Sequence, residues 1–205
     1  MQRYEIATLT TTLGAASRAA PAIEAFAGEA GAKGRLLGLW TTELGPLNQI
    51  LVLRGFETEA DLAAERRRTL LAANPFGSAE WLTGLALDSY VPFPELPPVA
   101  PGAYGAVYEF RTYILKHGGL GPTLEAWKAA VPPRAVLSPL TIAMYATDGA
   151  PRFTHIWPYP SLNDRLAVRG ESVRQGIWPP KGGPPWLTSD MRATVGLPTA
   201  NSPLR

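Results

Sequence analysis

The feature that most constrains this chain is an internal repeat with a spacing of about 104 residues. Tyr4-Glu5-Ile6-Ala7-Thr8 recurs as Tyr108-Glu109-Phe110-Arg111-Thr112, and both segments alternate as strands do. Between the copies lies the segment VPFPELPPVAPG, residues 91–102. Proline fixes φ and lacks a backbone donor, so this segment is expected to be a stiff, extended linker. The repeat predicts two copies of one unit, residues 1–98 and 99–205.

Within each copy the predicted elements follow the same order, which is strand, helix, strand, strand, helix, strand. Strands are expected at residues 4–8, 36–41, 48–53 and 86–91, and again at 108–112, 135–145, 153–157 and 192–197. The second helix of each copy should begin after Thr58 or Ser161, because each has an Asp three residues later, close to a capping box.

This order predicts an α+β fold made of two ferredoxin-like βαββαβ units. Each unit would be a four-stranded antiparallel sheet with both helices on one face. The other sheet face needs a cover, and the second copy can supply it. We therefore expect the two units to pack sheet to sheet as an intrachain α/β-barrel pseudo-dimer.

Composition narrows the chemistry. The 205 residues contain no cysteine, which excludes disulfides, thiolate nucleophiles and Cys-based metal sites. The two histidines fall on different elements, so no metal site is expected. The glycine patterns of nucleotide-binding loops are absent, and no bound cofactor is expected. The net charge is only +2, and we read the basic run Arg66-Arg67-Arg68 as a solvated helix face, not a nucleic-acid site. With no long apolar run and no secretory signal, the expected location is the cytoplasm, with no membrane span.

Ionisable and aromatic side chains gather at equivalent positions of two strands in the second copy. Alternation puts Glu109, Arg111 and Tyr113 on one face of their strand, and the neighbouring hairpin strand adds His155 and Trp157. The matching first-copy positions suggest ordinary packing; they are Glu5, Ala7, Leu9, Val52 and Arg54. We therefore predict a pocket between the second sheet and the opposite unit.

Two interpretations of these side chains stay open. In one, His155 moves a proton, Arg111 holds a carboxylate or enolate oxygen, and Glu109 orients either of them, which makes these three the catalytic candidates. Tyr113, Tyr145 and Trp157 would then contact the ligand. In the other, the polar groups only satisfy each other, as buried polar groups must. Whether the protein is an enzyme is left undecided by the sequence.

Two segments near the end of the chain, residues 179–186 and 199–205, are expected to lie outside the strands and helices. The proline-rich run Pro179–Trp186 is expected to clamp onto the body of the protein, or to act as a lid or partner-docking loop. Residues 199–205 are expected to be a frayed tail.

Several of these residues resemble the NIPSNAP family. The segment Tyr108–Tyr113 before a glycine-rich helix start resembles the opening of a NIPSNAP domain, and His155–Leu162, followed by Asp164 and Arg165, resembles a later part of it. Gly45–Ile50 resembles the family's hairpin turn. The resemblance covers both copies and implies a dimeric α/β-barrel fold, with a poorly defined biochemical role and cofactor-free oxygenases or isomerases among its wider relatives.

The first copy departs from the family motif, with Val52, Arg54 and Phe56 at the positions of His155, Trp157 and Tyr159. Any site should therefore lie mainly in the second copy. One hypothesis is a protein that binds a small organic molecule in a barrel pocket of that copy. The alternative is a noncatalytic structural or interaction module with a packed barrel interior. Homo-oligomers are common, so we also expect self-association.

Overall fold

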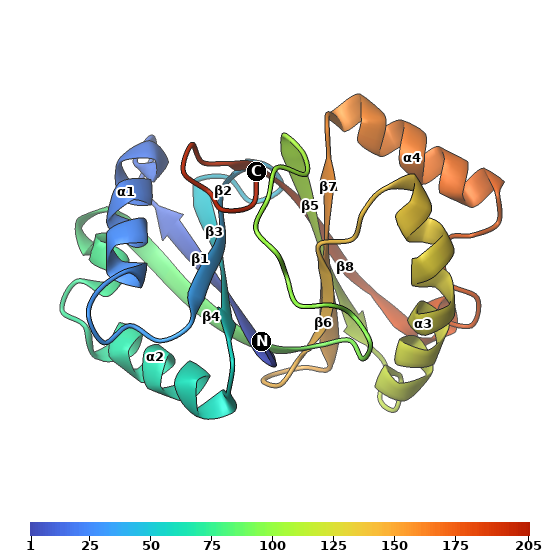
Figure 1. The fold of residues 1–205 in the computed structure, drawn as a ribbon, viewed down its shortest axis with the longest axis horizontal. Helices are drawn as coiled ribbons and strands as arrows, with labels where there is room; N and C mark the ends of the chain where they lie inside the picture. Colours follow the sequence, from blue (N-terminus) through green and yellow to red (C-terminus); the bar gives the residue numbers. More distant parts are fainter.

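The computed structural model describes all 205 residues and contains two βαββαβ units in tandem (Figure 1). The first comprises β1 (Arg3–Thr11), α1 (Ala16–Ala27), β2 (Arg35–Leu44), β3 (Gln49–Phe56), α2 (Glu59–Leu71) and β4 (Leu82–Pro92). The second comprises β5 (Val107–Leu115), α3 (Leu120–Leu137), β6 (Ile142–Ala146), β7 (Arg152–Tyr159), α4 (Leu162–Arg174) and β8 (Leu187–Pro198). Short 3₁₀ turns precede β4 and β8.

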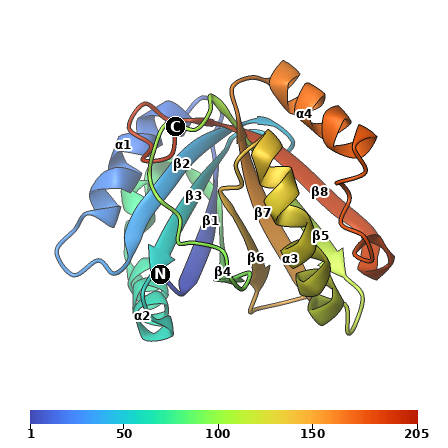
Figure 2. The same cartoon turned by 45° about the vertical axis from the view of Figure 1, so that its right-hand side comes forward.

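The eight strands close into one barrel in the order β1-β3-β2-β8-β5-β7-β6-β4. All of the pairings between these strands are antiparallel, and β2–β8 and β4–β6 join the two units. The helices lie outside, α1 and α2 against the first sheet and α3 and α4 against the second (Figures 1 and 2). The predicted fold class is confirmed, with the two sheets facing each other across the barrel.

The predicted helix starts are confirmed in atomic detail. Thr58 Oγ1 accepts a hydrogen bond from the backbone N–H of Asp61 at 3.1 Å, and Ser161 Oγ accepts one from Asp164 at the same distance. These bonds satisfy amide groups that have no partner inside the helix. The same local signal therefore fixes α2 and α4 at equivalent places in the two units.

One predicted strand is partly helical, and β4 and β8 begin at Leu82 and Leu187, earlier than the predicted residues 86 and 192. Residues 135–137 belong to α3, which continues through Pro132 and Pro133, and β6 begins only at Ile142. The apolar run from Ala135 suggested a strand, and two prolines normally end a helix. The last turn is held instead by Arg134, whose buried guanidinium lies 4.3 Å from the centre of the Trp157 ring.

The barrel interior is filled by apolar side chains from both units. Trp40 packs against Tyr108 and Phe110, with ring centroids 5.1 Å apart in each case. Gly38 makes room for this indole, since a Cβ there would lie 1.8 Å from the Trp40 ring. The remaining members of this cluster include Tyr4, Ile6, Leu51, Leu53, Tyr90, Met144 and Ile156.

The C-terminal segment closes one end of the barrel, so the prediction of a frayed tail is wrong. Leu204 is 1% exposed and belongs to the interior cluster. The backbone N–H of Leu39 donates to Ser202 Oγ at 2.9 Å, and the Ser202 hydroxyl donates to the Leu204 carbonyl. Backbone bonds also join Gly102 of the linker to Pro203 and Arg205. Linker and tail therefore brace each other.

A charged cluster joins the two units where β4 meets β6. Arg66 from α2 pairs with Asp148 of the β6–β7 turn at 3.2 Å, and Arg152 reaches both Asp148 and Asp88 at 2.8 Å. Arg68 pairs with Glu65, so two of the three arginines at 66–68 form ion pairs within the protein and the run is not only a solvated helix face.

None of the four helices is long and apolar enough to cross a bilayer.

Candidate functional site

The predicted site residues share one face of the second sheet, but that face does not look into the barrel. Trp157 and Phe153 belong to the cluster beneath α3 and α4, and Tyr113 and Tyr145 pack against it. The neighbouring strand positions Tyr108, Phe110 and Ile156 point into the barrel instead. The predicted site residues therefore face the helices, and the prediction that they face the opposite unit is wrong.

These side chains face the helices because only that side of the sheet offers partners for the buried Glu109 carboxylate. Both faces of this sheet are buried, so alternation along a strand identifies two faces without saying which one faces the helices. Arg165 and Arg169 project from α4 toward Glu109, whereas the barrel interior offers almost only apolar side chains. A buried carboxylate is stable only where cations and donors reach it.

Glu109 is the centre of a network of arginines. It is 1% exposed, and its Oε1 accepts hydrogen bonds from Arg111 at 2.8 Å and from Arg165 at 2.5 Å. Arg169 lies 3.6 Å from Oε2. Burial alone would raise the pKa of the Glu109 carboxyl, but the hydrogen bonds from Arg165 and Arg111 outweigh it and hold the pKa below its usual value. Arg111 also donates through Nε to the Tyr113 hydroxyl.

His155 lies beneath a layer of aromatic rings and is 2% exposed. Its Nδ1 accepts a hydrogen bond from the Trp157 indole N–H at 2.7 Å, and its Nε2 has no partner. Burial, with smaller contributions from Arg111, Arg169 and Arg134, holds the pKa of His155 well below its usual value. The imidazole is therefore neutral, and its hydrogen resides on Nε2 because Nδ1 acts as acceptor.

A cavity of about 350 Å³ lies on this side of the sheet, between the strands, the two helices and the proline-rich loop. Its aromatic lining comes from Tyr113, Trp127, Phe153 and Trp178, and its polar lining includes Arg169 and Thr123. The Trp127 ring lies 4.8 Å from the His155 ring. His155 therefore supports the aromatic wall from behind, and Tyr113 is the predicted site residue that reaches the cavity.

The other predicted residues lie around this cavity without lining it. Trp157 is buried between His155 and Arg134. Tyr145 lies on the same face of the sheet, partly buried at the end of β6. Within the proline-rich run, Pro179, Pro180 and Pro184 line the cavity together with the preceding Trp178, whose ring contacts Trp127 at 4.9 Å. The loop thus forms one wall of the cavity through Trp178, and not through Trp186, the tryptophan inside the run that was predicted to clamp.

The sequence interpretation missed the residues that the helices contribute, namely Thr123, Trp127, Arg134, Arg165 and Arg169. A signal was present for part of this set. Arg165 and Arg169 are four residues apart, so they share one face of α4. Nothing in the sequence indicated that this face meets Glu109, because that contact depends on how the helix crosses the sheet.

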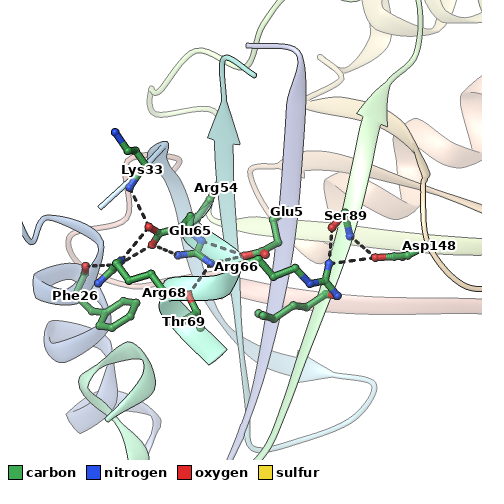
Figure 3. A network of polar contacts seen from close by, with 11 residues as sticks. Glu5, Phe26, Lys33, Arg54, Glu65, Arg66, Arg68, Thr69, Ser89 and Asp148 are labelled. Atoms are coloured by element: carbon green, nitrogen blue, oxygen red, sulfur yellow. Dashed lines mark hydrogen bonds and ion pairs between the residues drawn. The ribbon is translucent and has the colours of Figure 1, made fainter. Parts of the chain in front are cut away.

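The first unit also buries ionisable groups on its helix-covered face, contrary to the prediction that it would only pack (Figure 3). Arg54 pairs with Glu5 and with Glu65, the latter at 2.7 Å, and Arg68 also reaches Glu65. Burial raises the pKa of the Glu5 carboxyl despite its bonds to Arg54. Above this network Ile23, Phe26 and Phe76 fill the space under α1. The two units thus share a buried Glu at equivalent positions but differ in what surrounds it.

Comparison with known proteins places the chain in a family. The NIPSNAP family model matches residues 4–80 and 108–203, once in each unit. A NipSnap homologue from Dictyostelium discoideum is 27% identical over 145 residues, which is 69% of this chain. The matched part is 65% of the length of that curated relative.

Solved structures with the same fold include a proposed monooxygenase from Lactobacillus acidophilus, with a TM-score of 0.67 and 11% identity over 97% of this chain and 94% of the other. An anthrone oxidase-like protein superposes with a TM-score of 0.66 and 12% identity, over 98% and 93% of the two chains. These likenesses show the dimeric α/β-barrel fold. With its two matched repeats covering most of the sequence, the chain belongs to the NIPSNAP family.

Proposed function

We propose that this protein binds a small organic molecule in the helix-covered cavity of the second unit. The observation that carries the proposal is the difference between the two units. The first fills the space between its sheet and α1 with Ile23, Phe26 and Phe76, whereas the second leaves about 350 Å³ in the corresponding layer. Ligand pockets of this size, lined by aromatic side chains with a few polar groups, are typical of small-molecule sites.

The packed barrel interior is what the noncatalytic alternative predicts for that space, and the proposal therefore moves the pocket to the other side of the sheet. The names of the two structural neighbours refer to oxidative chemistry on small molecules and support a ligand of that size. Within the site, Tyr113 would contact the ligand, while Arg111 and Glu109 would position Tyr113. His155 would keep the aromatic wall in place through its contact with Trp127.

The test is a thermal-shift screen of a metabolite library against wild type and one cavity-blocking variant. A ligand that binds only the folded state raises the melting temperature. Val173, at the rim of the cavity on α4, is 60% exposed, so Val173→Trp should fold and cover the entrance. Leu70 occupies the equivalent position of α2 and is 64% exposed, which makes Leu70→Trp the matched control.

We expect hits whose shift disappears in Val173→Trp and persists in Leu70→Trp. Hits that respond equally in both variants would place binding elsewhere, and a library without hits would contradict the proposal. The cytoplasmic location and the self-association stay predictions, and light scattering of the purified chain tests the second. A single 22 kDa species would contradict self-association.

A further inference from the structure

The polar side chains that line the cavity, Arg169, Tyr113 and Thr123, can each donate a hydrogen bond to a ligand. Arg169 presents a guanidinium, which has no acceptor atom. The Tyr113 oxygen already accepts a hydrogen bond from Arg111, so its own hydrogen remains free to donate. Thr123 is 1% exposed and lines the cavity, yet its Oγ1 has no partner in the protein. The 13 lining residues include no aspartate or glutamate.

The charges behind this lining are unbalanced. Glu109 is the one carboxylate that pairs with Arg111, Arg165 and Arg169, and Arg134 has no acidic partner within ion-pair distance. Two donor nitrogens of this group, Arg134 Nη1 and Arg165 Nε, are buried without an acceptor, and Glu109 Oε2 is buried without a hydrogen bond although Arg169 lies 3.6 Å away. Guanidinium groups do not lose their protons in proteins, so the excess positive charge cannot be relieved by titration.

The first unit provides the internal comparison. There two buried carboxylates, Glu5 and Glu65, face two guanidinium groups, Arg54 and Arg68, and the charges balance (Figure 3). Beneath α1 of that unit, side chains such as Ile23, Phe26 and Phe76 fill the layer. The surplus of arginine thus occurs in the same unit as the open cavity. Guanidinium groups thus outnumber carboxylates around this cavity, and Arg169 at its lining is 34% exposed, which favours a ligand that brings a negative charge.

We propose that the cavity takes a flat organic anion, with its apolar body against Trp127 and Trp178 and its carboxylate at Arg169, Tyr113 and Thr123. This inference rests on the proposed function and specifies the class of ligand. Guanidinium and hydroxyl donors are the groups that recognise carboxylates, and aromatic walls suit a planar body. The cavity volume of about 350 Å³ admits a molecule with a single ring or with two fused rings.

The test compares 2-naphthoate with 2-naphthamide, which has nearly the same shape and no charge. Binding is measured by calorimetry and by quenching of tryptophan fluorescence, since Trp127 and Trp178 line the cavity. The variants are Arg169→Gln, Arg169→Lys and the control Arg174→Gln. Arg174 lies on the same helix, is 73% exposed and pairs only with Glu171. Glu109 keeps Arg111 and Arg165 when Arg169 is replaced, so the variants should fold.

We expect wild type to bind the carboxylate about tenfold more tightly than the amide, which is the size expected of a charge-assisted hydrogen bond. Arg169→Gln should remove this preference, Arg169→Lys should keep part of it, and Arg174→Gln should leave it intact. Equal binding of the two compounds, or a preference that Arg169→Gln does not change, would overturn the inference and leave the proposed function standing. If only neutral library compounds bind, the inference is likewise overturned, whereas the absence of any ligand would remove the proposed function itself.

Discussion

Trp157 donates its indole N–H to Nδ1 of His155 at 2.7 Å, from two residues further along the same face of β7. The bond is made inside one strand and beneath α3 and α4, so it does not depend on a ligand. It fixes the neutral imidazole with its hydrogen on Nε2. A neighbour on the same strand therefore fixes the tautomer and the ring orientation of His155 before any ligand is bound.

Because the folded-state pKa of His155 lies well below its usual value, the protein should lose stability as the pH falls through the histidine range. Below about pH 6.5 the unfolded chain binds a proton at this residue that the folded chain does not. The free energy of unfolding should then decrease by up to about 1.4 kcal/mol per pH unit from this group. Urea unfolding of wild type and His155→Phe at pH 7, 6 and 5 measures it.

The difference between the two proteins isolates His155, since the raised pKa of Glu5 acts in the opposite direction in both. The two stabilities should converge as the pH falls. Parallel curves from pH 7 to 5 would show that the folded protein protonates His155 at its ordinary pKa.

Arg54 should be the most sensitive charged residue of the first unit. Arg54→Leu would leave Glu5 and Glu65 buried without their shared partner, and removing one member of a buried ion pair costs about 3–5 kcal/mol. Arg3→Leu is the control, because Arg3 pairs with an exposed Glu59 and such pairs contribute about 0–1 kcal/mol. Chemical denaturation of both variants gives the comparison, and similar losses would argue against a strongly coupled buried network.

Gly38 should tolerate no side chain. A Cβ at this position would lie 1.8 Å from the Trp40 ring, so Gly38→Ala must displace an indole packed between the two units. Overpacking of this kind costs about 1–3 kcal/mol. In Gly84→Ala on β4 the new Cβ would meet nothing closer than 3.4 Å, and the melting temperature should change little. Equal melting temperatures for the two variants would contradict the packing described for the barrel.

The two helix caps should contribute equally. Thr58→Ala and Ser161→Ala each remove a side-chain acceptor from a helix N-terminus, at a cost of about 1 kcal/mol. Their double variant should lose the sum, because the caps lie in different units. Chemical denaturation of the three variants measures the free energy of unfolding. A much larger loss for Ser161→Ala than for Thr58→Ala would contradict the equal contribution and indicate that α4 packs less stably on its sheet than α2.

Much of the fold could be predicted because its determinants are local. The strand pattern shared by Tyr4–Thr8 and Tyr108–Thr112 predicted the repeat. The caps at Thr58 and Ser161 predicted where the second helix of each unit begins. The start of β6 was missed because α3 passes through Pro132 and Pro133, held by contacts of Arg134 with residues of β7. Such contacts lie beyond any local pattern.

The site could be predicted only in part, for the same reason. Alternation correctly grouped Glu109, Arg111, Tyr113, His155 and Trp157 on one face. It could not tell the helix side from the barrel side when both are buried. The partners of Glu109 come from α4, and the depth of the cavity depends on where α3 and the loop with Trp178 cross the sheet.

The ring of strands also determines how a fragment of this protein would behave. Residues 1–98 alone would leave β2 and β4 as open edges and would expose Tyr4, Ile6, Trp40 and Leu53 to water. We expect two copies of such a fragment to associate through these edges, because pairing them would rebuild an eight-stranded ring. Because the two units are joined in one chain, the pairing of the two different halves does not depend on protein concentration. One half can then keep an open cavity while side chains fill the corresponding layer of the other.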